Sequence, residues 1–211
     1  MRGFAPITFA LLACGNAGSP LLIQGVSVPT AAAGVCSAGL AQTASLDIDL
    51  KVDTGILTPA VVGSMLLANN TPPTNALTPQ PDPFLKRTNT SDIQLTSAAI
   101  ELFDDTGASQ GKVNEPVTLN ISAGGSGSIV MAVVPDLTKY FAEVYAGLLD
   151  TKLKRFVARV QFSGHYTSGA SIKSNTFDVP VGMCNGCAKC PKGTSAAPVV
   201  CGTSAINVTC S

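Results

Sequence analysis

The stretch DIQLTSAAIELFDDTG, residues 92–107, decides how this chain folds. Its apolar residues alternate with polar ones, which is the period of a strand with one buried face. The alternation changes parity in the middle, because Ile93 and Leu95 lie on one parity while Ile100 and Leu102 lie on the other. An extra residue in a β-bulge produces such a switch. We therefore predict one long strand with a bulge near its centre.

The same alternation, read outward from this strand, predicts an all-β chain of about seven strands. The predicted strands cover 45–51, 61–68, 93–103, 117–121, 128–134, 156–162 and 176–183. The run 61–68 (VVGSMLLA) is apolar except for Ser64, which predicts a more fully buried strand. Turn residues at 104–107 and 168–171 separate strands, and Gly124–Gly127 is predicted to join 117–121 and 128–134 into a hairpin.

Two further features refine this architecture. Pro180 cannot donate a ladder hydrogen bond, so the last strand is expected at a sheet edge or at a bulge. A helix is predicted over 137–149, because Asp136 can cap it and apolar residues recur at spacings of four, three and four. The expected fold is an immunoglobulin-like antiparallel β-sandwich over residues 45–183, with one short helix.

Composition excludes several classes of protein. Lys and Arg number 13 and Asp and Glu number 13, so no net field steers the chain to nucleic acid. Regular alternation excludes disorder throughout. At 211 residues the chain has room for one sizeable domain plus flexible segments.

The amino terminus predicts export and lipid anchoring. Arg2 precedes a short apolar run, and the tetrad Leu11-Leu12-Ala13-Cys14 ends it, so residues 1–13 are expected to be a signal peptide cut before a lipidated Cys14. If Cys14 is lipidated, the next residue, which is Gly15 and not Asp, resembles that of lipoproteins that are transferred to the outer membrane. The alternatives are an ordinary signal peptide cut after Ala17, which would release a secreted or periplasmic protein, or a buried cytosolic helix.

Residues 14–44 are rich in Gly, Ala, Ser, Pro and Thr and are predicted to form a flexible tether. The apolar patch Leu21-Leu22-Ile23 could instead pack locally. Residues 69–82 contain four prolines without periodicity and are predicted to form an exposed loop.

The number and positions of the cysteines indicate how the carboxyl-terminal tail, residues 184–211, is held together. Setting Cys14 aside leaves six cysteines, an even number that permits three disulfides: Cys36, Cys184, Cys187, Cys190, Cys201 and Cys210. Five of them lie in the tail, so if all are oxidised within the chain, Cys36 must bond to one of those five. An oxidising compartment favours disulfides.

Two other uses of the tail cysteines stay open. The spacing of Cys184, Cys187 and Cys190 also suits a metal–thiolate site, with Cys201 or Cys210 as a fourth ligand. A redox-active pair at Cys184 and Cys187 is the third reading, although no thioredoxin-like pattern surrounds it.

Catalytic patterns are scarce, so we expect neither an enzyme nor a cofactor. His165 is the sole histidine and no Gly-x-Ser-x-Gly elbow accompanies it. Asp47, Asp49 and Asp53 lack the spacing of a calcium loop, and acids that alternate along a strand form its wet face. Asp104-Asp105 is explained by turn chemistry. The sequons at Asn69, Asn89, Asn120 and Asn207 are expected to be incidental.

A family resemblance rests on several of these segments together. The tetrad Leu11-Leu12-Ala13-Cys14 resembles a lipobox, the motif at which lipoprotein signal peptides are cut. The chain resembles a group of outer-membrane-type bacterial lipoproteins in this tetrad, the low-complexity tether, VVGSMLLANN, DIQLTSAAIELFDDTG and the closing FDVPVGMCNGCAKCP, over roughly residues 45–201. The resemblance implies an immunoglobulin-like body with a cysteine-rich tail, and it implies no activity.

Two function classes follow. The first is a non-catalytic structural or binding module at the cell envelope, held at the membrane through Cys14, whose loops 69–82 and 167–173 meet an envelope protein or a glycan. The second is a metal-binding or electron-transfer lipoprotein that uses the tail cysteines. An enzyme ranks third.

Overall fold

The computed structural model describes residues 19–32, 35–38, 45–49, 60–73, 90–134, 154–184, 196–201 and 204–210. Within these ranges the chain is mainly β-strand and contains no helix. The helix predicted over 137–149 lies outside the described residues, as does the loop 69–82 beyond Pro73.

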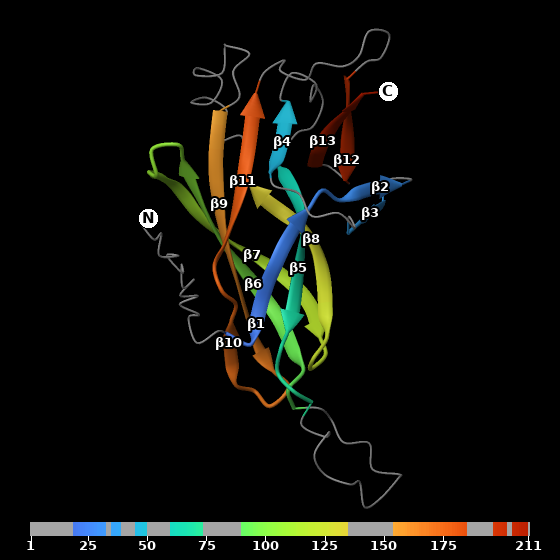
Figure 1. Ribbon diagram of the computed structural model, residues 1–211, viewed down its shortest axis with the longest axis vertical. Helices are drawn as coiled ribbons and strands as arrows, with labels where there is room; N and C mark the ends of the chain where they lie inside the picture. Colours follow the sequence, from blue (N-terminus) through green and yellow to red (C-terminus); the bar gives the residue numbers. More distant parts are fainter. Residues whose placement is uncertain are drawn as a thin grey trace, which may run out of the picture.

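A three-stranded antiparallel sheet forms one layer of the molecule (Figure 1). Its strands are β1 (Leu21–Ser27), β5 (Val61–Asn69) and β8 (Ser126–Val134), in the order β1-β5-β8. The central strand β5 is buried at eight of its nine positions, which confirms the prediction from its largely apolar sequence.

A six-stranded sheet forms the other layer. It contains β4 (Leu46–Asp49), β6 (Ile93–Asp104), β7 (Ser109–Ile121), β9 (Lys154–Tyr166), β10 (Ser171–Lys173) and β11 (Phe177–Cys184). The order is β4-β11-β9-β6-β7, and β10 pairs with the end of β9. All pairs are antiparallel except β11 with β4, which is parallel. The expectation of a purely antiparallel sandwich is therefore wrong at this pair, because pairing order is set by packing and not by strand periodicity.

The inward faces of both sheets share one hydrophobic core, in which Leu67 of β5 and Phe162 of β9 are fully buried. The layers approach closely at Gly63. A Cβ there would lie 2.8 Å from the Val133 side chain and 2.9 Å from that of Leu46, so only glycine fits without repacking. Gly63 thus lets β4 close one end of the core.

The predicted bulge in β6 is confirmed. The pairing register shifts between Leu95 and Ser97 on both sides of β6. Against β9, Thr96 is the extra residue, whereas against β7 the extra residue belongs to β7. Ile93 and Leu95 before it, and the even-numbered apolar residues after it, all reach the core. Opposite the bulge, a Cβ on Gly164 would meet the Gln94 carbonyl at 2.2 Å. Glycine is required there because β6 and β9 approach so closely.

The hairpin predicted between 117–121 and 128–134 is wrong. β7 pairs with β6 and β8 pairs with β5, so the connecting turn carries the chain from one sheet to the other. Gly125 donates its N–H to the Ser122 carbonyl at 2.9 Å and accepts from the Asn69 N–H at 2.9 Å. Glycine-rich turns serve hairpins and inter-sheet crossings alike, so the residues of the turn could not distinguish the two.

The buried Asn69 side chain fastens this crossing. Its Nδ2 donates to the carbonyls of Ser91 at 2.8 Å and Ile121 at 3.3 Å, and its Oδ1 accepts from the Thr71 N–H at 3.0 Å. One amide therefore joins β5 to the start of β6 and the end of β7. Its hydrogen bonds satisfy polar groups that would otherwise be buried without partners.

Part of the predicted tether belongs to the core. Leu21, Ile23 and Val26 of β1 are buried, so the alternative in which Leu21-Leu22-Ile23 packs locally describes this segment and the flexible reading is wrong there. The Ile23 N–H donates to Asn175 Oδ1 at 2.7 Å. Asn175 lies between β10 and β11, so this bond connects the two layers.

Pro180 lies at the start of the parallel pairing. β9 flanks it on one side, and β4 pairs with β11 only from Val181 onward. The expected edge position thus applies to the first half of β11, whereas its second half is internal to the sheet.

Two small hairpins complete the described residues. One consists of β2 (Thr30–Ala32) and β3 (Val35–Ser37), and the other of β12 (Ala196–Cys201) and β13 (Ser204–Cys210). Strand β13 contacts β4 and β5, and β12 contacts β2. Figure 1 shows both hairpins on the β4 side of the molecule.

Candidate functional site

The outer face of the six-stranded sheet carries a row of four charged side chains in register. Lys112 of β7 is paired with Glu101 of β6, Glu101 with Arg159 of β9, and Arg159 with Asp178 of β11. The signs alternate along the row, so each side chain has an opposite charge as its cross-strand neighbour. Such pairs stabilise a sheet weakly and fix its register. We call these four residues the charged row.

The strongest contact in the charged row is a two-pronged one. Arg159 donates from Nε to Asp178 Oδ1 at 2.8 Å and from Nη2 to Asp178 Oδ2 at 3.0 Å. This hydrogen bond lowers the pKa of Asp178 and raises the pKa of Arg159. The guanidinium also lies 4.9 Å from the centre of the Phe103 ring, a cation–π contact. Three strands thereby hold Arg159 in one position.

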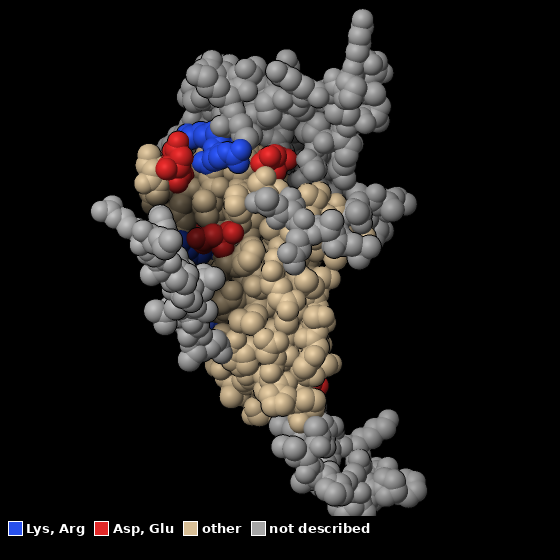
Figure 2. Space-filling view, viewed as in Figure 1, with Lys and Arg blue, Asp and Glu red and all other residues tan. Residues whose placement is uncertain are grey.

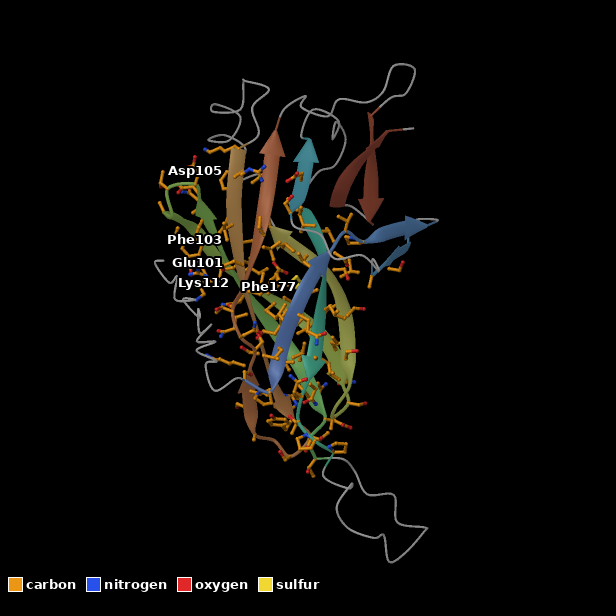
Figure 3. The ribbon with its side chains drawn as sticks, viewed as in Figure 1. Glu101, Phe103, Asp105, Lys112 and Phe177 are labelled. Atoms are coloured by element: carbon orange, nitrogen blue, oxygen red, sulfur yellow. The ribbon has the colours of Figure 1, made fainter. Side chains whose placement is uncertain are left out.

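Figure 3 shows Phe103, Glu101 and Lys112 together along the β6–β7 hairpin, away from β1 and β5. In the space-filling view, the visible charged side chains gather toward the end of the molecule that contains this hairpin (Figure 2). The remaining coloured surface is largely uncharged. The charged row thus belongs to a localised polar surface, because the charged side chains are not spread evenly over the visible face.

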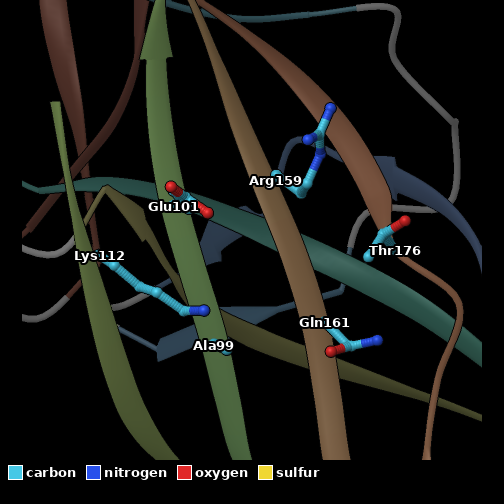
Figure 4. A pocket seen from close by; sticks show the side chains of 6 residues that line it. All are labelled: Ala99, Glu101, Lys112, Arg159, Gln161 and Thr176. Atoms are coloured by element: carbon cyan, nitrogen blue, oxygen red, sulfur yellow. The ribbon is translucent and has the colours of Figure 1, made fainter. Parts of the chain in front are cut away.

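A small hollow of about 100 Å³ lies within this surface. It is lined by Ala99, Glu101, Lys112, Arg159, Gln161 and Thr176. The hollow exists because Ala99 is the outward-facing residue of β6 two positions before Glu101, and a longer side chain there would fill the space. Lys112 extends from β7 across β6 and ends beside Ala99 (Figure 4).

Several lining groups retain hydrogen-bonding capacity. Among the described residues, none forms an ion pair with Lys112. Glu101 accepts from the Ser109 hydroxyl at 2.9 Å through Oε1, which leaves Oε2 as an acceptor. Gln161 donates from Nε2 to the Ser174 carbonyl at 3.1 Å, which leaves Oε1 as an acceptor. The hollow therefore offers both donors and acceptors to a small ligand.

The turn after β6 uses its acid locally, as predicted. Asp104 Oδ1 accepts from the Thr106 hydroxyl at 2.6 Å, the Thr106 N–H at 2.9 Å and the Ala108 N–H at 2.9 Å, and Oδ2 accepts from Gln110 at 2.6 Å. The hydrogen bond from the Thr106 hydroxyl is the main cause of a lowered Asp104 pKa. Asp104 is committed to an Asx-type turn and is not free to bind a cation.

His165 lies apart from the hollow. Its Nε2 is 3.1 Å from Gln94 Oε1, across the β6–β9 pair. Strands β6 and β10 flank His165, so it does not lie at a sheet edge, and this contact joins it to a neutral side chain. It does not supply the acid that a Ser–His–Asp arrangement requires.

The cysteines fall in several places. Cys36 is in β3, Cys184 ends β11, and Cys201 and Cys210 lie in β12 and β13, whereas Cys14, Cys187 and Cys190 are outside the described residues. The contact between β12 and β2 brings the two hairpins that contain Cys36 and Cys201 together. In the described part of the chain, no three metal-ligating side chains are grouped. Asp47 is exposed on β4, as expected for a wet face.

The periodicity of the sequence did not identify the charged row or the hollow. Glu101, Arg159 and Asp178 occupy outward positions on predicted strands, where a charge is ordinary, and Lys112 precedes the strand predicted over 117–121. The missing information was strand order and register, which place residues 77 positions apart, Glu101 and Asp178, two strands from each other. The one available signal was an acid or a base at an outward position on each of three predicted strands.

Comparisons with known proteins add little. No protein-family model matches the sequence, and no curated protein matches it. One similar solved structure is titled "X-ray structure of Northeast Structural Genomics Consortium target SoR45"; the two chains share 11% identity over 56% of this chain and 67% of that one, with a TM-score of 0.31. A score this low supports no argument about fold type or function. In the ranges described above, no helix has the length and apolar character to cross a membrane.

Proposed function

We propose that this chain is a cell-envelope lipoprotein, anchored through Cys14, whose immunoglobulin-like sandwich is a non-catalytic binding module. The binding face is the outer face of the six-stranded sheet. Both sheets and one continuous core support the sandwich, and the amino-terminal tetrad that ends in Cys14 supports export.

The observation that carries the proposal is the hollow beside the charged row. Strands β6, β7 and β9 contribute its lining together with Thr176, which precedes β11, and Arg159 is held by Asp178 and Phe103, so the face is organised before any partner arrives. Preorganised polar groups around a depression give specificity at low entropic cost. The loop 167–173 was predicted from the sequence to contact a partner, but its residues 171–173 form strand β10. The sheet face is therefore a more extensive rigid surface than this loop.

Photo-crosslinking in living cells tests the binding face. A photoreactive amino acid at exposed Asn114, which is paired with Ala99 on the same face, is expected to give a discrete adduct with an envelope component. The matched control is the same amino acid at exposed Ser128 of β8, in the other sheet. Equal adducts at both positions, or none at 114, would contradict the binding face.

Intact mass spectrometry tests the anchor and the tail together. Protein extracted from membranes is expected to begin at Cys14 with attached lipid, and reduction is expected to add two hydrogens for each disulfide among the remaining six cysteines. A Cys14→Ser variant is expected to leave the membrane fraction. Bound zinc or iron with titratable thiols would overturn the disulfide assignment and favour the metal-binding alternative.

A further inference from the structure

The hollow beside Ala99 has a composition that narrows the chemistry of its ligand. Its volume of about 100 Å³ corresponds to roughly three water molecules, which is enough for part of one sugar ring and its hydroxyl groups. Ala99 is the smallest lining residue, and among the residues that the structure describes no aromatic side chain lines the hollow. The ligand is therefore held by polar contacts.

Charge balance disfavours an anionic ligand. Lys112 and Arg159 contribute two positive charges, but Glu101 lies between them in the charged row and Asp178 already neutralises Arg159. A phosphate or carboxylate that approached Lys112 would also approach the Glu101 carboxylate. Binding would then pair one charge favourably and one unfavourably, with little net gain.

Alternation of sign also disfavours a zwitterion such as a free amino acid. A zwitterion site needs its cation and its anion on opposite sides of the ligand. Here Lys112 and Glu101 both line the hollow from the β6–β7 side, and Arg159 on the β9 side is already paired with Asp178. A ligand whose groups each donate and accept hydrogen bonds suits this interleaved pattern better.

Hydroxyl groups match what the lining retains. Lys112 supplies donors, Glu101 Oε2 and Gln161 Oε1 supply acceptors, and the Thr176 hydroxyl supplies both. Arg159 uses two of its donors on Asp178 and keeps the others. From this arrangement we propose that the hollow binds a neutral saccharide, as one residue of an envelope glycan. This assignment rests on the proposed function, since it names the ligand of the same face.

Titration of isotope-labelled full-length Cys14→Ser protein with maltotriose and with chitotriose tests the assignment by NMR. At least one neutral saccharide is expected to shift the backbone resonances of Ala99, Lys112 and Gln161 at millimolar concentration. Glycine and citrate, as zwitterion and anion, are expected not to shift them.

Two variants locate the binding. Ala99→Leu fills the hollow and is expected to weaken saccharide binding by about tenfold or more, whereas Ser128→Leu on the other sheet leaves it unchanged. Lys112→Met, at an exposed position that does not support the core, is expected to weaken binding as well and provides a second test if Ala99→Leu perturbs the spectrum.

Two results would overturn the assignment: no shift of the lining residues by either saccharide, whether or not glycine or citrate shifts them, or saccharide binding that Ala99→Leu and Lys112→Met both leave intact. A discrete crosslink from position 114 combined with either result would refute the saccharide and leave the binding face standing. The absence of the crosslink would refute the proposed function itself.

Discussion

The two faces of the six-stranded sheet are built from the same strands and behave differently. Along β9, Phe162 and Val160 point into the core and are fully buried, while the alternate residues Gln161 and Arg159 point outward. The inner face excludes water and supplies the hydrophobic stabilisation of the fold. The outer face is held only by exposed pairs, which contribute little to stability and are free to serve binding. Alternate residues of the same strand therefore serve stability on the inner face and the candidate site on the outer face.

Truncation of an inner-face aromatic is the largest expected effect. Phe162→Ala should lower the free energy of unfolding by about 3–5 kcal/mol, because it removes a fully buried ring and leaves a cavity. The adjacent outer-face change Gln161→Ala should cost about 1 kcal/mol or less, since one part-buried hydrogen bond is lost. Chemical denaturation of both variants measures the contrast. Equal costs would mean that the two faces do not differ in the way described.

Loss of the Asn69 side chain, which joins the two sheets, should have the second-largest effect on stability. Asn69→Ala is expected to cost about 1–3 kcal/mol, because the carbonyls and the N–H that its side chain satisfies remain buried. Its exposed neighbour provides the control, since Asn70→Ala should change stability by no more than about 0.5 kcal/mol. Both can be measured by the same denaturation experiment. If the two substitutions cost the same, the side chain of Asn69 is not the fastening between the sheets.

Disruption of the charged row should have a smaller effect that depends on pH. The Arg159 and Asp178 side chains are 46% and 49% exposed, so Asp178→Asn is expected to lower the Tm at pH 7 by only about 1–3 °C. Because folding lowers the pKa of Asp178, its contribution is present above the unfolded pKa of about 4 and is lost as pH falls through the folded value.

Thermal melts at several pH values check this sign. The difference in Tm between wild type and Asp178→Asn should be largest near neutral pH and should shrink below about pH 4. Arg159→Met should show the same dependence, because it removes the other half of the same pair. A difference that grows on acidification would contradict the sign of the pKa change.

The smallest effect tests whether parity alone means burial. Val113 of β7 is paired with buried Ile100 and shares its inward parity, yet it is 38% exposed because it lies near the edge of the sheet. Val113→Thr should therefore change the free energy of unfolding by at most about 0.5 kcal/mol. Val160→Thr, on a central strand, should cost about 1–3 kcal/mol because its hydroxyl would be buried. Comparable losses would show that parity outweighs distance from the edge.

Much of the strand content was predictable, and the errors share one cause. The bulge at Thr96 followed from a change of parity within one strand, and the Asp104 turn followed from its residue types. The wrong hairpin between β7 and β8 and the wrong purely antiparallel pairing of β4 concern which strand neighbours which. The candidate site was not predicted for the same reason, because the hollow beside Ala99 depends on three neighbouring strands in one register.

The sequence by itself determined where most strands of the two sheets lie, which of their faces are apolar, and that β6 must switch parity, because these properties arise from residues within a few positions of one another. Only the tertiary structure decided that β1 joins the core, that the turn at 122–125 crosses between sheets, and that Lys112, Glu101, Arg159 and Asp178 form a row. Those outcomes depend on how two sheets bury their apolar faces against each other. Burial is a property of the whole packed chain, so no local pattern contains it.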